Sequence, residues 1–408
     1  MGVHRLSRRE GEAAPIRHQL RWLAAVVVAV AVLELVIAAT TLGTEDVRRW
    51  SAFAAGIADV GPWRVYGQAL VAYQTSYNHP PLAGDLLWLT GGIAGDLRTF
   101  AFVLRIPGIA ASALTPFLVF ELVRRRRSAD DALLAAAAVA LSPALIAISG
   151  FHGNTDTVVV ALSLASVYLL VDRRAPAWSG VVIALAVGLK LVPVVVIPVL
   201  LVGAWQLDRR AIRRFVTGAA VVSLLIWIPA LVTSGGSLVE GVLGYAGGVQ
   251  PWGLGEVADR LGADGLVVAL RGAGRVVAVL VAAGLPAWLL WRSPDVVVEA
   301  AAISFTALLA FSSGFGMQYL AWAIAPAYLL HFGWATGFNV MASWLAWQVY
   351  TRWSGGLPWA LSSPFVGIEV LTGFIAWVCL VGVVVTGIRT CFPPSGSGAL
   401  RPKVPSRA

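Results

Sequence analysis

Long apolar runs alternate with short polar or basic stretches along most of the chain. An α-helix needs about 20 apolar residues to cross the hydrocarbon of a bilayer, and many of these runs reach or approach that length. The runs that predict membrane-spanning helices are 20–42, 99–123, 131–149, 155–171, 178–204, 215–233, 265–291, 296–312, 318–333, 335–351 and 366–388. We therefore expect an all-α polytopic membrane protein with about twelve spans.

Short bursts of arginine between the apolar runs predict the orientation of the chain. They occur at 124–127, at Arg173 and Arg174, and within 209–214. Loops rich in Lys and Arg stay in the cytoplasm. If the apolar segment 80–94 crossed the membrane, the next span would carry 124–127 to the outside. We therefore predict that 80–94 lies at the outer interface and that both termini are cytoplasmic.

The same rule divides the long run 178–204. Arg174 and Arg209 flank this run, and both are expected in the cytoplasm. The run must then go out and return as two short helices. We expect the turn near Lys190 and Pro193.

These spans form a single multi-span membrane domain, residues 20–388. A cytoplasmic segment, 1–19, precedes this domain, and a basic cytoplasmic tail, 389–408, follows it and is expected to be disordered. The first extracytoplasmic loop, 43–98, is the longest outer segment and is expected to carry interfacial helices. Chemistry on the outer face should therefore involve this loop.

The composition supports a membrane protein, which we expect in the plasma membrane, and excludes several other classes. The chain of 408 residues is 58% hydrophobic and 12% charged, whereas a soluble domain is about 25% charged. The net charge is +9, but the basic residues are spread over loops and form no face for nucleic acid. Two cysteines do not make a disulfide framework.

Two acidic residues directly follow the first span, at Glu45 and Asp46. Thr44 as N-cap with these acids in the first turn would stabilise a helix over 45–58, which is one reading of the pattern. The other reading is functional, because a carboxylate at the lipid–water boundary can act as a base on a lipid-linked substrate. The apolar positions that predict an amphipathic, interfacial helix are Val47, Trp50, Phe53, Ala54 and Ile57.

The first outer loop ends at Asn78 and His79, which are followed by Pro80 and Pro81. Two prolines suit the first turn of a helix, with Asn78 or His79 as the cap. The free N–H groups of that helix would favour phosphate. A rigid turn without a ligand is the simpler alternative.

The second outer turn places His152, Asn154, Thr155 and Asp156 between two long apolar spans. Polar groups in such a place are costly unless they line water or a ligand. Asn154 or Thr155 would cap the next helix, with Asp156 in its first turn. His152 and Asp156 could share a ligand, but one His and one Asp do not define a metal site.

Unusual polar residues also occur near the outer ends of later spans. Lys190 lies within an apolar run, and Arg271 and Arg275 lie at the outer end of theirs, against the positive-inside trend. Such cations are candidates for function, although they can also contact lipid headgroups. Gln318 and Tyr319 open another span, where Gln318 could hydrogen-bond a sugar.

Together these segments resemble the glycosyltransferase C (GT-C) superfamily, in particular its bacterial mannosyltransferase-like members that use polyprenyl-phosphate sugars. The matching pieces, in the order of the family, are Glu45-Asp46, 77–82, 150–156, 188–193 and 314–319. The resemblance implies an inverting transfer of a sugar, mannose or another hexose or pentose, from polyprenyl phosphate to a lipid, glycan or protein acceptor outside the cytoplasm.

The resemblance also assigns roles. Asp46 would be the catalytic base, and His79, Lys190, Arg271 or Arg275 would stabilise the leaving phosphate. The residues expected to contact substrate are Glu45, Asn78, His79, His152, Asn154, Asp156, Lys190, Arg271, Arg275, Gln318 and Tyr319. No metal ligands are assigned and no cofactor is certain, but a divalent metal is possible. Membrane lipids are expected partners.

The rival interpretation is a membrane transporter or a flippase for lipid-linked sugars. Transporters place polar groups near the midplane of the membrane, on broken helices. Here Glu34 is the main acid within a span, and the other polar clusters lie at the outer rim. This distribution favours the enzyme.

Overall fold

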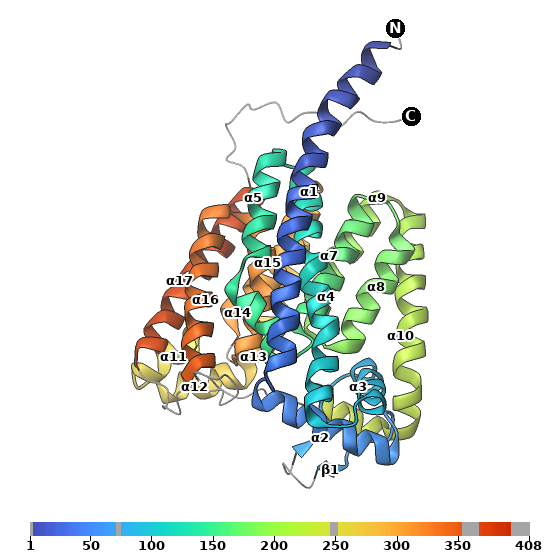
Figure 1. Cartoon of the computed structure of the whole chain (residues 1–408), viewed down its shortest axis with the longest axis vertical. Helices are drawn as coiled ribbons and strands as arrows, with labels where there is room; N and C mark the ends of the chain where they lie inside the picture. The colour runs from blue at the N-terminus through green and yellow to red at the C-terminus, as the bar shows by residue number, and fades with distance from the viewer. Residues whose placement is uncertain (1–2, 71–74, 245–251, 313, 353–366, 393–408) are drawn as a thin grey trace.

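The computed structural model describes residues 3–70, 75–244, 252–312, 314–352 and 367–392. The chain is helical over most of these residues (Figure 1). The helices of 20 residues or more are α1 (Val3–Thr40), α4 (Leu97–Arg124), α10 (Arg209–Leu238), α13 (Ala273–Arg292), α16 (Phe332–Arg352) and α17 (Gly367–Cys391). The shorter helices of the bundle are α5 (Ala129–Ala140), α6 (Pro143–Ala147), α7 (Asp156–Val171), α8 (Pro176–Leu189), α9 (Ile197–Leu207), α14 (Val297–Phe311) and α15 (Leu320–Leu330).

Short helices gather at one end of the bundle, the lower end in Figure 1. They are α2 (Glu45–Val60), α3 (Pro81–Ile93), α11 (Gly253–Arg260) and α12 (Asp264–Arg271). Single turns of π-helix, η1 (Ile148–His152) and η3 (Val239–Leu243), and of 3-10 helix, η2 (Val192–Val196) and η4 (Met317–Tyr319), interrupt the bundle. The first loop also contains one ladder of two residues a strand, in which β1 (Ala69–Leu70) pairs antiparallel with β2 (Thr75–Ser76).

Within the described ranges, six helices are long and apolar enough to cross a membrane. They cover Ile16–Thr40, Leu97–Arg124, Ala129–His152, Arg209–Leu243, Ala273–Arg292 and Ile368–Cys391. Four more apolar helices are shorter, and the predicted total of about twelve spans is therefore not confirmed by length. The short α14 and α15, of 15 and 11 residues, are buried over most or all of their length. Because protein surrounds α14 and α15, neither helix has to be as long as the bilayer is thick.

The run 178–204 forms the predicted hairpin. Helix α8 ends at Leu189, the chain turns, and α9 returns after η2. Lys190 lies at the turn with φ −160° and ψ 142°, which is an extended conformation. The turn therefore displays Lys190 at the end of two helices.

The prediction of one span over 265–291 is wrong. Gly272, with φ −89° and ψ −103°, separates α12 from α13, so that the long helix begins only at Ala273. Helix α12 carries Asp264 and Arg271 at its two ends, and these charges favour a separate surface helix over the start of a span. Arg271 and Arg275 consequently lie on different helices.

The segment 80–94 forms α3, whose 13 residues span about 20 Å and cannot cross a bilayer. It packs beside α2 at the lower end of the bundle (Figure 1). Helix α2 buries all five of the residues predicted for its apolar face, Val47, Trp50, Phe53, Ala54 and Ile57.

A buried arginine fixes the point where α1 ends and the first loop begins. Arg105 of α4 is 1% exposed, and its Nη1 donates to the carbonyls of Ala38 at 3.0 Å and Thr41 at 2.9 Å. These carbonyls lie at the C-terminal end of α1, where helical partners are missing. Gly43 then turns the chain with φ +88°, a conformation that favours glycine. This turn places the first residues of α2.

Two polar contacts lie at different levels of α4, one between Glu34 and Ser112 and one between the arginine burst and Asp172. Glu34 of α1 is fully buried and accepts a hydrogen bond from Ser112 of α4 at 2.8 Å. At the other end of α4, Arg125 and Arg126 lie 3.7 and 3.8 Å from Asp172, which follows α7. The arginine burst therefore lies at the end of α4 opposite to α2 and α3.

Candidate active site

A cavity of about 530 Å³ opens among α2, the start of α3, the hairpin turn, η3, α13 and η4. Its polar and aromatic lining consists of Asp46, Arg49, Trp50, Asn78, His79, Asn154, Lys190, Arg275, Gln318, Tyr319 and Trp322. Segments from five separate parts of the chain thus bring most of the predicted substrate-contacting residues to one cavity. Its apolar lining includes Leu191, Val192, Val242, Leu243, Val276, Val279 and Leu280.

Asp46 lies in the first turn of α2, and Thr44 occupies the N-cap position as predicted. The Thr44 hydroxyl does not cap the helix but donates to the carbonyl of His152 at 3.0 Å. Oδ2 of Asp46 lies 3.0 Å from Nε2 of His152 and accepts from Nδ2 of Asn154 at 3.5 Å. The second outer turn therefore holds the Asp46 side chain, which remains 31% exposed.

The charges around Asp46 keep it ionised. Burial alone raises the pKa of Asp46, but the hydrogen bond and charge of His152, with the charges of Lys190 and Arg49, outweigh it. The pKa of Asp46 falls to about 2. An ionised carboxylate only accepts hydrogen bonds, so we assign the proton of the shared bond to Nε2 of His152. A carboxylate in this state can receive a proton from a substrate.

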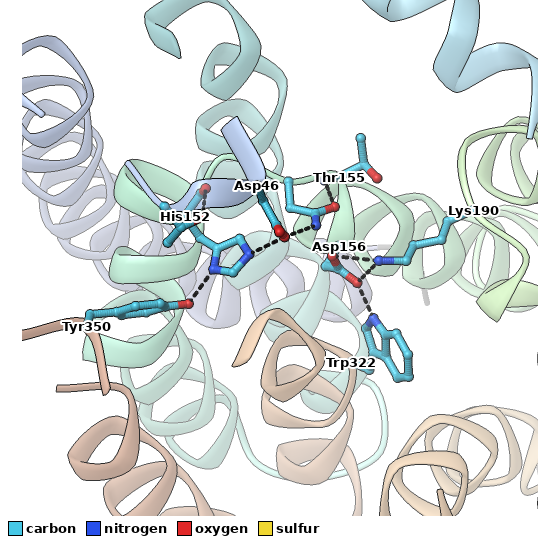
Figure 2. Close-up of polar contacts among 9 residues, drawn as sticks. Asp46, His152, Thr155, Asp156, Lys190, Trp322 and Tyr350 are labelled. Carbon is cyan, nitrogen blue, oxygen red and sulfur yellow. Dashed lines mark hydrogen bonds and ion pairs between the residues drawn. The ribbon is translucent and has the colours of Figure 1, made fainter. Parts of the chain in front are cut away.

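His152 reaches Asp46 because of the local backbone. It ends the π-helical turn η1, and Gly153 follows with φ +79°. Its Nδ1 lies 2.8 Å from the hydroxyl of Tyr350 in α16 (Figure 2). His152 does not itself line the cavity.

His152 and Asp156, which could have shared a ligand, have different partners in the structure. Thr155 is the N-cap of α7, and Asp156 opens the helix, as predicted. Asp156 is fully buried, and both of its oxygens bind Nζ of Lys190, at 2.7 and 2.8 Å. Nε1 of Trp322 also donates to Asp156, at 2.5 Å. Asp156 therefore holds Lys190 and Trp322 (Figure 2) and does not itself line the cavity.

Lys190 lies against two aromatic rings. Its Nζ is 5.3 Å from the ring centre of Tyr319 and 5.7 Å from that of Trp322. The two rings stack on each other at 4.0 Å. A cation that is fixed by a buried carboxylate and two ring faces is pre-organised for an anionic ligand.

His79 lies in an aromatic environment that keeps it neutral. Its ring is 4.5 Å from that of Trp50, and its carbonyl accepts from the Tyr66 hydroxyl at 2.9 Å. Burial, together with the charge of Lys190, lowers the pKa of His79 to about 3. The prediction that Asn78 or His79 caps α3 is wrong, because Pro80 is the N-cap. His79 can therefore offer a neutral hydrogen-bonding ring to a ligand.

Besides His152 and Asp156, two further predicted site residues, Glu45 and Arg271, do not line the cavity. Glu45 is 58% exposed, forms an ion pair with Arg48 at 3.7 Å and does not line the cavity. Arg271 is exposed on α12 and does not line the cavity, whereas Arg275 on α13 does. Adjacent residues of a helix point in different directions, which explains the first case.

Sequence reasoning missed Arg49 and Tyr350. Arg49 is three residues after Asp46 on α2, so helical spacing could have identified it. Tyr350 has no local motif and reaches His152 only through the packing of α16. No group of three or more His, Cys, Asp or Glu residues that could hold a metal occurs in the described part of the chain.

The sequence of the chain was compared with family models and with curated proteins. Residues 78–232 match the family model described as dolichyl-phosphate-mannose-protein mannosyltransferase. This segment contains His79, His152, Asp156 and Lys190 but not Asp46. A comparison with curated protein sequences found no match.

Solved structures with a similar fold include ArnT from Cupriavidus metallidurans. The structure bound to undecaprenyl phosphate has 13% sequence identity and a TM-score of 0.51, over 91% of this chain and 77% of ArnT. The structure of ArnT in the apo state has 13% sequence identity and a TM-score of 0.50, over 90% of this chain and 77% of ArnT. An Archaeoglobus fulgidus oligosaccharyltransferase tethered to an acceptor peptide has 13% sequence identity over 90% of this chain and 55% of its own chain. Its TM-score is 0.41, and we draw no conclusion from it.

The family match and the ArnT fold agree with the resemblance that the sequence motifs indicated. At 13% identity the ArnT likeness shows the fold alone. The match over 78–232 independently contains three of the five motif segments, 77–82 except Tyr77, 150–156 and 188–193. Residues 78–232 therefore resemble this mannosyltransferase family in sequence, and the fold of the chain is similar to that of ArnT.

Proposed function

We propose that the protein is an inverting glycosyltransferase that moves a sugar from a polyprenyl-phosphate donor to a hydroxyl acceptor. The observation that carries the proposal is the composition of one cavity. An ionised carboxylate, Asp46, shares it with the cations Arg49, Lys190 and Arg275. The carboxylate suits a general base, and the cations suit a phosphate that leaves with negative charge.

The proposed reaction assigns a role to each charge. Asp46 takes the proton of the acceptor hydroxyl while that oxygen bonds to the anomeric carbon of the sugar. The bond between the anomeric carbon and the phosphate oxygen breaks, and its electrons leave with polyprenyl phosphate. Lys190, held by Asp156 at 2.7 Å, stabilises that charge together with Arg275 and Arg49. Attack opposite the leaving phosphate inverts the anomeric configuration.

The apolar wall of the cavity supports a lipid-linked donor. Leu243 of η3 and Val276 and Leu280 of α13 line the cavity, and they are 59%, 54% and 64% exposed. Exposed apolar residues on a membrane helix face lipid. A prenyl chain could thus remain among lipid tails while its phosphate reaches Lys190.

We further propose that the cavity faces away from the cytoplasm, in a plasma-membrane protein with about twelve passes and both termini inside. The arginine burst 124–127 supports this orientation, because it lies at the end of α4 opposite to α2 and α3. Labelling of a single cysteine at position 97, in a variant lacking Cys379 and Cys391, tests the orientation. Labelling from the cytoplasm alone would reverse it.

The direct test is sugar transfer by the purified protein in proteoliposomes. Undecaprenyl phosphate carrying radiolabelled mannose, other hexoses or pentoses would be offered with lipid, glycan and peptide acceptors. We expect label in an acceptor with inverted anomeric configuration. Movement of intact donor across the bilayer without any transfer would instead support a flippase, and retained configuration would refute the proposed mechanism.

A further inference from the structure

The ring of His152 stands between Asp46 of α2 and Tyr350 of α16 (Figure 2). Nε2 is 3.0 Å from Oδ2 of Asp46, and Nδ1 is 2.8 Å from the Tyr350 hydroxyl. Asp46 lines the cavity, but His152 and Tyr350 do not and are only 5% and 4% exposed. Tyr350 therefore lies outside the lining of this cavity, and its contact with His152 links it to Asp46.

We propose that Tyr350 is a positioning residue that acts through His152 to keep one oxygen of Asp46 available to the acceptor hydroxyl. This inference rests on the proposed role of Asp46 as base. It adds a residue from the C-terminal part of the chain, outside the matched segment 78–232.

The hydrogen bonds to Asp46 distinguish its two oxygens. His152 and Asn154 both bond Oδ2, at 3.0 and 3.5 Å. Among the residues that the structure describes, none donates to Oδ1. The lone pairs of Oδ1 thus stay available for a substrate proton, while Oδ2 holds the carboxylate in place. A partly exposed Asp side chain would otherwise rotate between several orientations.

Tyr350 suits this task because a phenol hydroxyl can donate or accept. Ionised Asp46 requires a proton on Nε2, so Nδ1 either accepts from Tyr350 in the neutral ring or donates to it in the charged ring. The ring keeps its place in both states. The other charged groups near this turn include Arg49 of α2, Arg105 of α4, which packs against Gly153, and the pair of Asp156 with Lys190.

Mutation can separate the hydroxyl of Tyr350 from the packing of its ring. The Tyr350 ring also contacts Phe151 edge-on at 5.4 Å between ring centres. Tyr350→Phe keeps this ring contact and removes only the hydroxyl. A matched control is Tyr328→Phe, because Tyr328 is 1% exposed and its hydroxyl accepts from Asn339 in a network that does not line the cavity.

The first test is kinetic, with undecaprenyl-phosphate mannose as donor in proteoliposomes. We expect Tyr350→Phe to lower kcat about 3- to 10-fold, the effect of losing one hydrogen bond, with the donor KM within twofold. The acid limb that Asp46 sets below about pH 5 in the kcat–pH profile should move to higher pH, because a weaker bond from His152 lowers the pKa of Asp46 less. In a His152→Asn background the same change should have no further effect, because the link to Asp46 is already absent. Tyr328→Phe should alter neither kcat nor the profile.

The second test needs no turnover. In ¹⁵N-histidine-labelled protein, the His152 signals are identified among the five histidines by their loss in His152→Asn. Tyr350→Phe should move the Nδ1 signal of His152, and Tyr328→Phe should not. An unmoved signal, or a kcat loss of equal size with and without His152, overturns the inference. If Asp46→Asn retains turnover, the proposed base itself fails. If Asp46→Asn is inactive while Tyr350→Phe behaves like the wild type, the role of Asp46 as base stands and only the proposed role of Tyr350 fails.

Discussion

Replacement of Asp46 by asparagine separates a catalytic carboxylate from a structural one. Asn keeps the shape of the side chain and an oxygen that can accept from His152 Nε2. It loses the negative charge and the ability to hold a proton. We expect expression and membrane insertion to be unchanged and sugar transfer to fall about 100- to 10,000-fold, as for the loss of a general base.

The structure limits the stability part of this change. The loss of an acid from the first turn of α2 costs about 0.3–1 kcal/mol through the helix dipole. The side chain is 31% exposed, and the bond to His152 persists in a neutral form, so the added cost is of similar size. A 100- to 10,000-fold loss of rate corresponds to about 2.7–5.4 kcal/mol of activation free energy. The two effects are therefore distinguishable.

The assay is turnover of purified variants in proteoliposomes at saturating donor, with thermal unfolding measured in parallel. Glu45→Gln is the matched control, because Glu45 is 58% exposed, lies outside the cavity lining and should stay within twofold of the wild type. An Asp46→Asn variant with more than about one-tenth of wild-type turnover would refute the assignment. Asp156 could not then take over the role, since it is fully buried against Lys190.

The pKa of Asp46 adds a pH dependence. Because its folded value is lowered to about 2, the stability that its charge contributes is present above the unfolded pKa of about 4 and is lost as the pH falls toward 2. Protonation of Asp46 should therefore cause no loss of transfer between about pH 5 and 8. A wild-type rate–pH profile with an acid limb in that range, which persists in His152→Asn, would contradict the lowered pKa.

Three further predictions follow from the cavity and the turn before α2. Arg275→Gln should raise the donor KM about 5- to 50-fold, whereas Arg271→Gln should stay within twofold, because only Arg275 lines the cavity. Lys190→Met should lower the free energy of unfolding by about 3–5 kcal/mol, because it leaves the buried Asp156 without its cation. Adding Asp156→Asn to Lys190→Met should restore stability but not activity. Gly43→Ala should destabilise far more than Gly61→Ala in thermal unfolding, because both have positive φ but only at Gly43 would Cβ meet the carbonyl of a neighbouring turn, at 2.6 Å.

Much of the fold could be predicted, because membrane helices are specified by local hydropathy and by the placement of arginines. The α8–α9 hairpin was deduced from the flanking arginines, and the buried face of α2 followed from helical spacing. The break at Gly272 was missed because 265–291 is apolar on average, and an average hides one irregular backbone position. The short α15 was read as a full span for the same reason.

The site was predicted in its parts rather than in its arrangement. Several residues in motifs, such as His79 and Lys190, line the cavity. Local sequence cannot show whether a polar residue faces the cavity or supports a neighbour. His152 and Asp156 were therefore expected to contact substrate, although each lies behind a lining residue. Tyr350 depends on tertiary packing, which no motif reports.

The order in which Asp46, His152 and Tyr350 are synthesised has a consequence for biogenesis. His152 follows Asp46 by 106 residues, and Tyr350 follows His152 by a further 198. At ribosomal speeds of about 5–20 residues per second, Tyr350 emerges roughly 10–40 s after His152. During this interval Asp46 and His152 can already pair in the membrane, but α16 has not yet been inserted. On the proposed role of Tyr350, full activity is a property of the nearly finished chain, because nascent or truncated chains that end before α16 lack the contact between Tyr350 and His152.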